Sequence, residues 1–318
     1  TCPGGRHIAL GSRCATNQMF PSRYGQLLAV HQKASHEMFE TNPYFPDFDD
    51  VRRRRVEFYS TRQPVCRSRA VVTMVRDEPE FLPIWLEYYS RFFAPEDIYV
   101  LDHQTSDGST SRGGFNRVPV VRPVFSERWF TELRAEFQHG LLRTYDLVVV
   151  CDVDEIIAPL PKWGHLGKYL DRFDEDFVNC RGYELLHVPE REVPLDPGRP
   201  VLQQRRHWFR NPLYDKPSVA TVPMQWGLGF HRRADGLVSY DPDLYLIHLH
   251  RMDYDLCLTR RRRRALMARS ESDLRAGNGY QNVIVDDEEF ARWFHHETGL
   301  DSHVVEVEEI DPSWQSVV

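Results

Sequence analysis

The stretch from Leu147 to Ile157 reads LVVVCDVDEII, a valine-rich apolar run that ends abruptly in carboxylates. A run of this length and composition predicts a buried strand. Asp152 and Asp154 then lie at its carboxyl end, where open α/β sheets bind their ligands. Strand residues two apart point to the same side, so both carboxylates are expected to face one site. Such a pair attracts Mg²⁺ or Mn²⁺, which can bridge to phosphate; an acidic turn after a core strand is the alternative.

Length and composition indicate a globular protein. The 318 residues are enough for one large domain, with or without additions. Hydrophobic residues make up 41% and charged residues 27%, which excludes a disordered chain. The net charge of −7 gives no reason to expect a nucleic acid as partner. Because no apolar run is long enough to cross a bilayer, we expect no transmembrane segment and a cytoplasmic protein, with peripheral membrane contact as the alternative.

The elements before the Asp152 strand alternate between strands and helices. Strands are expected at 70–75, 98–101 and 118–121, and helices at 79–92 and 127–145. This alternation is typical of a parallel α/β sheet with right-handed crossovers. Three strand ends in that sheet finish in carboxylates, namely Asp77, Asp102 and Asp152. Three acidic strand ends on one edge indicate a polar ligand there.

Three motifs in this order resemble those of GT-A glycosyltransferases, close to the family 2 and family 92 groups. The matching segments are VTMVRDE at 72–78, VLDHQTSDGS at 100–109 and CDVDE at 151–155, within a resemblance that covers about residues 68–255. The resemblance implies an α/β fold of GT-A type, with a mostly parallel sheet flanked by helices, over residues 68–256. Residues 1–67 are then an N-terminal extension, and residues 257–318 a helical C-terminal extension.

The same resemblance implies a nucleotide-sugar donor, UDP-sugar being favoured, and a carbohydrate or other hydroxyl acceptor. Asp102 would contact the nucleoside, and the loop from Thr73 to Asp77 would form the other wall. Asp152 and Asp154 would hold the diphosphate through Mn²⁺ or Mg²⁺. A turn-forming cap is the alternative for Asp102, and N-terminal helix capping is the alternative for Asp77.

The later half of the chain adds candidates on two further segments. Lys216 precedes an expected strand, and a Gly-x-His turn ending at His231 follows, as in related transferases. Lys216 could supply a charge for phosphate, a surface lysine being the alternative. His248 and His250 face the same way on an expected strand. In this fold a histidine near the end of the domain commonly completes the metal site; a pair of satisfied strand histidines is the alternative.

Glu184 is the residue that we expect to act as general base. It interrupts the apolar stretch from Tyr183 to Val188, where an unpaired charge would be costly. Partial burial would raise its pKa toward a useful value. An inverting transferase needs such a group to take the proton of the acceptor hydroxyl. Glu190, Asp215 and His187 are the other candidates for the base, and a glutamate on the solvent face of an edge strand is the alternative for Glu184.

Five consecutive arginines occupy residues 260–264 of an expected helix over 256–269. They point all round the helix, so one or two could reach back to the diphosphate. No aromatic residues are interleaved with them, and we therefore expect no nucleic acid partner.

The sequence thus predicts a metal-dependent glycosyltransferase, with inversion favoured. A catalytically silent nucleotide- or sugar-binding module on the same fold is the first alternative. A phosphatase with an aspartyl nucleophile is less favoured. Such enzymes carry their motif near the first strand with Thr or Val two residues after the second Asp, where this chain has Ile156.

Overall fold

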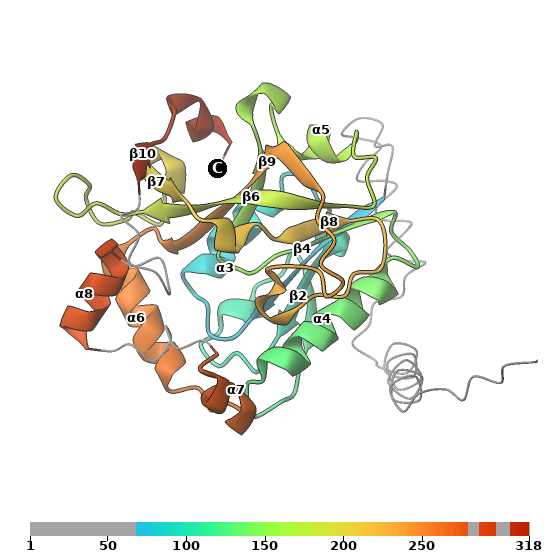
Figure 1. Cartoon of the computed structure of the whole chain (residues 1–318), viewed down its shortest axis with the longest axis horizontal. Helices are drawn as coiled ribbons and strands as arrows, with labels where there is room; N and C mark the ends of the chain where they lie inside the picture. The colour runs from blue at the N-terminus through green and yellow to red at the C-terminus, as the bar shows by residue number, and fades with distance from the viewer. Residues whose placement is uncertain (1–67, 279–285, 297–305, 318) are drawn as a thin grey trace, which may run out of the picture. The chain divides into compact units, whose positions relative to one another are not determined.

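The computed structural model describes residues 68–278, 286–296 and 306–317, all within the unit Pro43–Val318 (Figure 1). The expected N-terminal extension, residues 1–67, lies outside them. The described chain forms a ten-stranded sheet flanked by helices, in the order β10-β7-β6-β8-β4-β1-β2-β3, with β9 paired to β5 and β6. The predicted α/β class is confirmed.

The first four strands form the parallel half of the sheet. They are β1 (Arg69–Val75), β2 (Ile98–Asp102), β3 (Asn116–Pro119) and β4 (Leu147–Val150), and the order β4-β1-β2-β3 is parallel throughout. Helix α3 (Phe81–Tyr89) connects β1 to β2, and α4 (Glu127–Leu141) connects β3 to β4. Since parallel strands end at a common edge, the segments after β1, β2 and β4 meet there. The predicted gathering of three acidic strand ends is therefore confirmed.

The second half of the sheet is largely antiparallel. It contains β5 (Glu155–Pro159), β6 (Phe177–Leu186), β7 (His207–Arg210), β8 (Pro217–Ala220), β9 (Tyr240–Arg251) and β10 (Val307–Glu309). Strand β8 joins the halves, being antiparallel to both β4 and β6. Strand β9 runs parallel to β6 and antiparallel to β5. Because β6 continues beyond its pairing with β8, its later residues lie past the carboxyl edge of β4.

The pairing of β9 fixes which side chains meet at that edge. His248 is the register partner of Glu155 on β5 and of Glu184 on β6. Side chains directly opposite each other on neighbouring strands project from the same face. In addition, the backbone N–H of Leu249 donates to the carbonyl of Asp154 at 2.7 Å. Asp154 therefore lies beside the two histidines of β9.

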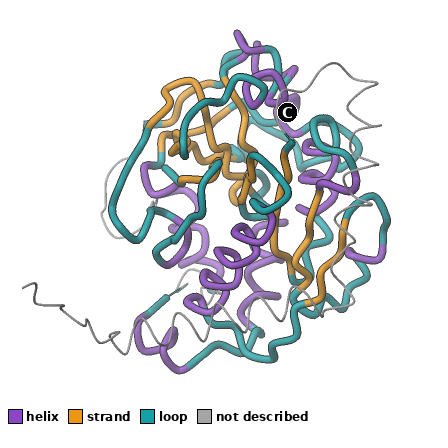
Figure 2. Tube along the Cα trace, turned by 90° about the vertical axis from the view of Figure 1, so that its right-hand side faces the viewer, coloured by secondary structure: helices purple, strands orange, loops and turns teal. Residues whose placement is uncertain are grey.

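Short helices complete the described chain: α5 (Leu166–Leu170), α6 (Tyr254–Ala265), α7 (Glu271–Ala276) and α8 (Asp287–His296). Figure 1 shows the last three below the strands, from α8 at the left to α7 at the bottom, and Figure 2 shows the helices packed against the strands from the side. Asp253 is the N-cap of helix α6, and its side chain accepts a hydrogen bond from the N–H of Leu256. Within the described ranges, no helix is long and apolar enough to span a bilayer.

We predict that Gly182→Ala destabilises the protein. A Cβ at this position would lie 2.5 Å from the Cβ of Tyr214 and 2.6 Å from the carbonyl oxygen of Asn211, so the backbone must shift. Such overpacking lowers the free energy of unfolding by about 1–3 kcal/mol. Urea unfolding measures the change, and Gly113→Ala is the matched control because nothing lies within 4 Å of its added Cβ. Equal losses in the two variants would contradict the prediction.

Candidate active site

Asp152 and Asp154 lie in the turn between β4 and β5. The strand ends at Val150, so strand alternation does not govern the two carboxylates, and each has its own set of partners. The side chain of Asp152 is 30% exposed, whereas that of Asp154 is 6% exposed. The site therefore has an open part around Asp152 and a buried part around Asp154.

Asp154, His248 and His250 form the buried part. Each offers a ligand atom, and these atoms lie within 4.8 Å of one another. One oxygen of Asp154, Oδ2, is 3.5 Å from Nε2 of His248 and 3.5 Å from Nδ1 of His250. Burial lowers the pKa of His250, so its imidazole is neutral, and its buried Nε2 has no hydrogen-bond partner among the described residues. One carboxylate and two imidazoles are a donor set that fits Mn²⁺.

Arg260 of α6 binds the same oxygen of Asp154 and lies 3.4 Å from Nδ1 of His250. Its Nη1 donates to Asp154, while Nε and Nη2 donate to Glu78 at 2.8 and 2.9 Å. Burial would raise the pKa of Asp154, but the charges of Arg260 and His248 outweigh it and hold the pKa well below its usual value. Asp154 is therefore ionised, and any bound cation shares it with the guanidinium.

Glu184 lies behind His248. Its Oε2 atom is 2.9 Å from Nδ1 of His248 and 3.3 Å from Nη1 of Arg251, and its side chain has 0% exposed surface. Burial would lower the pKa of His248, but the charges of Glu184 and Asp154 outweigh it and raise the pKa to about 9. A side chain without exposed surface is badly placed to take a proton from an acceptor. The geometry favours Glu184 as the group that orients His248.

Two basic side chains hold Asp152. Arg134 of α4 donates to Oδ1 at 2.6 Å, and Lys216 donates to Oδ2 at 2.8 Å. Lys216 also lies 2.6 Å from Glu155 Oε1. Burial would raise the pKa of Asp152, but the charges of Lys216 and Arg134 outweigh it and keep the pKa below its usual value. Lys216, which the sequence predicts as a phosphate-binding residue, therefore lies next to the acidic motif at residues 152–155.

Arg134 is a site residue that the sequence does not single out, and Arg260 is one of the five arginines of which one or two were expected to reach the site. Both stand on the buried faces of their helices: Arg134 lies four residues after buried Phe130, and Arg260 lies three after buried Cys257. Residues three or four apart share a helix face. An arginine on the apolar face of a helix is thus the sequence feature that could have identified both residues, because a buried charge needs a partner of opposite charge.

Asp102 is buried and its carboxylate is fully engaged. It accepts from the N–H of Thr105 at 2.8 Å, from Oγ1 of Thr110 at 2.9 Å and from Nε of Arg117 at 2.6 Å. Although burial would raise the pKa of Asp102, these hydrogen bonds lower it. These contacts are those of a residue that caps a turn, which is the alternative role given above for Asp102. Asp102 would therefore affect nucleoside binding only by fixing the conformation of this loop.

Asp77 and His231 lie on loops around the site. Asp77 has a left-handed backbone, with φ of 52°, and its Oδ1 accepts from the N–H groups of Ser106 and Asp107 at 2.7 and 3.1 Å. It therefore joins the loops that follow β1 and β2. His231 bonds the carbonyl of Leu213 through Nδ1, and burial with the charge of Lys216 lowers its pKa to about 4. His231 is consequently neutral near pH 7.

Known proteins offer weak likenesses. No family model matches the chain, and no curated protein matches it. Glucosyl-3-phosphoglycerate synthase from Mycobacterium tuberculosis, solved with Mn²⁺, UDP and glucosyl-3-phosphoglycerate, is 21% identical over 37% of this chain and 44% of its own, with a TM-score of 0.25. The match thus spans less than half of that enzyme. A mannosyltransferase from Pyrobaculum calidifontis, solved with GDP-Man and Mn²⁺, is 13% identical over 76% of this chain and 71% of its own, with a TM-score of 0.33. With TM-scores below 0.5, these likenesses do not assign the chain to a family.

We predict that the protein loses stability as the pH rises from 6.5 to about 9 in EDTA. The pKa of His248 is raised from 6.5 to about 9, so the folded state holds a proton that the unfolded state has lost in this window. The contribution of His248 is therefore complete below pH 6.5 and is lost as the pH passes through about 9. The slope is at most about 1.4 kcal/mol per pH unit. Urea unfolding across this range checks it, and an unchanged slope in His248→Gln would contradict the assignment.

Proposed function

We propose that this protein is a metal-dependent glycosyltransferase that moves a sugar from a nucleoside diphosphate to a hydroxyl acceptor. The observation that carries the proposal is the cluster of Asp154, His248 and His250 at the edge where the parallel strands end. Beside it lies Asp152 with two cations, Arg134 and Lys216. A metal site next to fixed positive charges suits a substrate that carries a diphosphate. A UDP-sugar as donor and inversion at the anomeric carbon are the finer parts of the proposal, and both come from the sequence resemblance.

In the proposed reaction the buried part of the site around Asp154 and the open part around Asp152 have different roles. The acceptor oxygen bonds to the anomeric carbon, the bond from that carbon to the diphosphate breaks, and the hydroxyl proton passes to a base. Asp154, His248 and His250 would hold Mn²⁺ or Mg²⁺, which supplies positive charge for the departing diphosphate. Arg134 and Lys216 add fixed charges next to the exposed Asp152.

Glu184 enters the proposal as a positioning residue. Its carboxylate bonds the Nδ1 atom of His248, and this leaves the Nε2 atom directed toward Asp154. A carboxylate on the second nitrogen of a ligating histidine fixes the ring and raises its basicity. The role expected from the sequence, general base, conflicts with the full burial of Glu184.

We predict that Asp154→Asn abolishes Mn²⁺-dependent sugar transfer, because it removes the one carboxylate of the cluster. Radiolabelled transfer and donor hydrolysis from a panel of UDP- and GDP-sugars measure the effect, with Mn²⁺ and with EDTA. Asp235→Asn is the matched control: this aspartate is 45% exposed, and within the described chain its ion-pair partner is Arg233. Full transfer in EDTA would exclude metal dependence. Donor binding without hydrolysis or transfer would favour the silent binding module.

We predict that Glu184→Gln weakens Mn²⁺ binding by about 10- to 100-fold, the usual effect of losing a carboxylate behind a metal-binding histidine. Titration of the protein with Mn²⁺, followed by electron paramagnetic resonance, measures the affinity. A general base would act differently, since its loss lowers the transfer rate and leaves Mn²⁺ affinity unchanged. Unchanged affinity with lost transfer would therefore restore the role expected from the sequence.

A further inference from the structure

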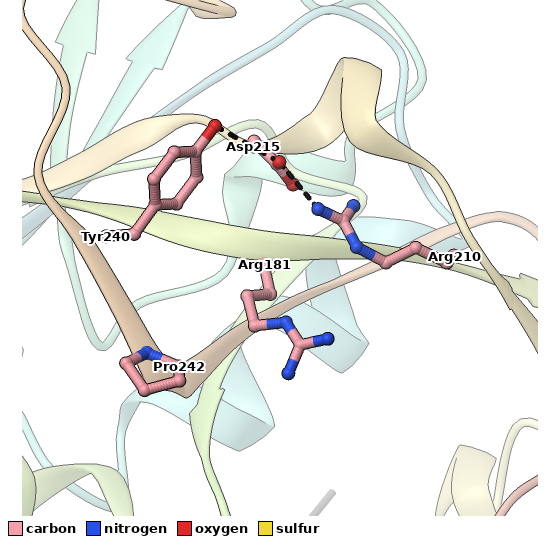
Figure 3. Close-up of a pocket in the computed structure, with 5 residues that line it drawn as sticks. All are labelled: Arg181, Arg210, Asp215, Tyr240 and Pro242. Atoms are coloured by element: carbon pink, nitrogen blue, oxygen red, sulfur yellow. Dashed lines mark hydrogen bonds and ion pairs between the residues drawn. The ribbon is translucent and has the colours of Figure 1, made fainter.

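A hollow of about 330 Å³ opens on the opposite face of β6 from the candidate active site. Its lining residues are Arg181, Arg210, Asp215, Tyr240 and Pro242 (Figure 3). Successive residues of a strand point to opposite faces, so Arg181 projects away from the side that carries Glu184. The size is within the range of small-molecule pockets. The hollow is therefore a separate place for a ligand.

The two arginines of the hollow differ in their partners. Nη2 of Arg210 is 2.6 Å from Asp215 Oδ2, and Nη1 donates to the carbonyl of Gly182 at 2.8 Å. Arg181 donates a long hydrogen bond, 3.5 Å, to the hydroxyl of Tyr245, and no carboxylate of the described chain forms an ion pair with it. Figure 3 shows the Arg181 guanidinium apart from the bonded series Tyr240, Asp215 and Arg210. The charge of Arg181 is thus available to an anion.

Aromatic rings hold the Arg181 guanidinium in place. Tyr183 and Tyr245 stack with centroids 5.0 Å apart and an interplanar angle of 22°. The Cζ atom of Arg181 lies 5.4 Å from the Tyr245 centroid and 6.0 Å from that of Tyr183. Stacked arginines keep their planar donor fork free for a carboxylate or phosphate. At the rim, Tyr240 is 57% exposed and offers an aromatic face to a ligand in the hollow.

We propose that this hollow binds an acidic sugar unit, with the sugar carboxylate on Arg181 and the apolar face of the ring against Tyr240. A uronic acid combines the two features that the hollow presents, an anion within reach of a guanidinium and a ring that packs on an aromatic side chain. Arg210 and Asp215 fix the opposite wall through their mutual ion pair. This site is independent of the proposed transfer reaction, because none of its five lining residues belongs to the candidate active site.

The test measures equilibrium binding of D-glucuronate to the 318-residue chain in EDTA, using an NMR titration. D-glucose and inorganic phosphate are the two comparison probes, since each carries one of the two features. We expect glucuronate to bind more tightly than either. Arg181→Gln should lower glucuronate affinity at least about tenfold, as expected for the loss of a charge-assisted hydrogen bond. Arg199→Gln is the matched control, because Arg199 is exposed and does not line the hollow.

A second variant tests the sugar part of the proposal. Tyr240→Ala should weaken glucuronate binding and leave phosphate binding unchanged, whereas Tyr240→Phe should keep most of the glucuronate affinity. Unchanged glucuronate affinity in Arg181→Gln would overturn the site. Phosphate binding as tight as glucuronate binding would overturn the assignment to a sugar, and equal binding of glucose would overturn the role of the charge.

Discussion

The interaction on which the site depends is the pairing of buried Arg260 with Glu78 and Asp154. One guanidinium connects the segment after β1, the segment after β4 and helix α6. None of these charges is exposed by more than 6%, so each needs an opposite charge to offset its lost hydration. Removing one member of such a buried pair lowers stability by about 3–5 kcal/mol, chiefly because the other charge is left uncompensated. Loss of this pairing would therefore disturb both the acidic edge of the sheet and the packing of α6 against it.

The register of β9 imposes the second constraint. His248 must lie opposite both Glu155 and Glu184, and a shift of one residue would turn both histidines of β9 to the other face. The apolar residues next to them in β9 keep this register, because Leu246, Ile247 and Leu249 are all fully buried. The packing of these apolar side chains in the core thus determines which residues of β9 face Glu155 and Glu184.

Sequence reasoning identified the parallel half of the sheet and its acidic strand ends, since valine-rich runs and an aromatic helix face are local signals. It did not find β5 or β7. The first follows β4 after a four-residue turn and reads as the continuation of one apolar run. That turn also explains why Asp152 and Asp154 have separate partners. Likewise, Glu184 was recognised as an unusual charge in an apolar stretch, but its role depended on a partner 64 residues away. Local sequence patterns can show that a charge is buried, but only the tertiary structure shows which residue carries the opposite charge.

The run of five arginines in α6 has a consequence for how the chain folds. Neighbouring cations repel one another, and the contacts that offset this repulsion are distant in sequence: Arg260 reaches Asp154 across 106 residues and Glu78 across 182. Contacts that close such long loops form slowly, because the chain loses entropy before they are made. Helix α6 should accordingly be among the last elements to become stable in folding. The polypeptide would then complete its acidic edge only after the sheet is built, so that partly folded chains carry an incomplete cation site.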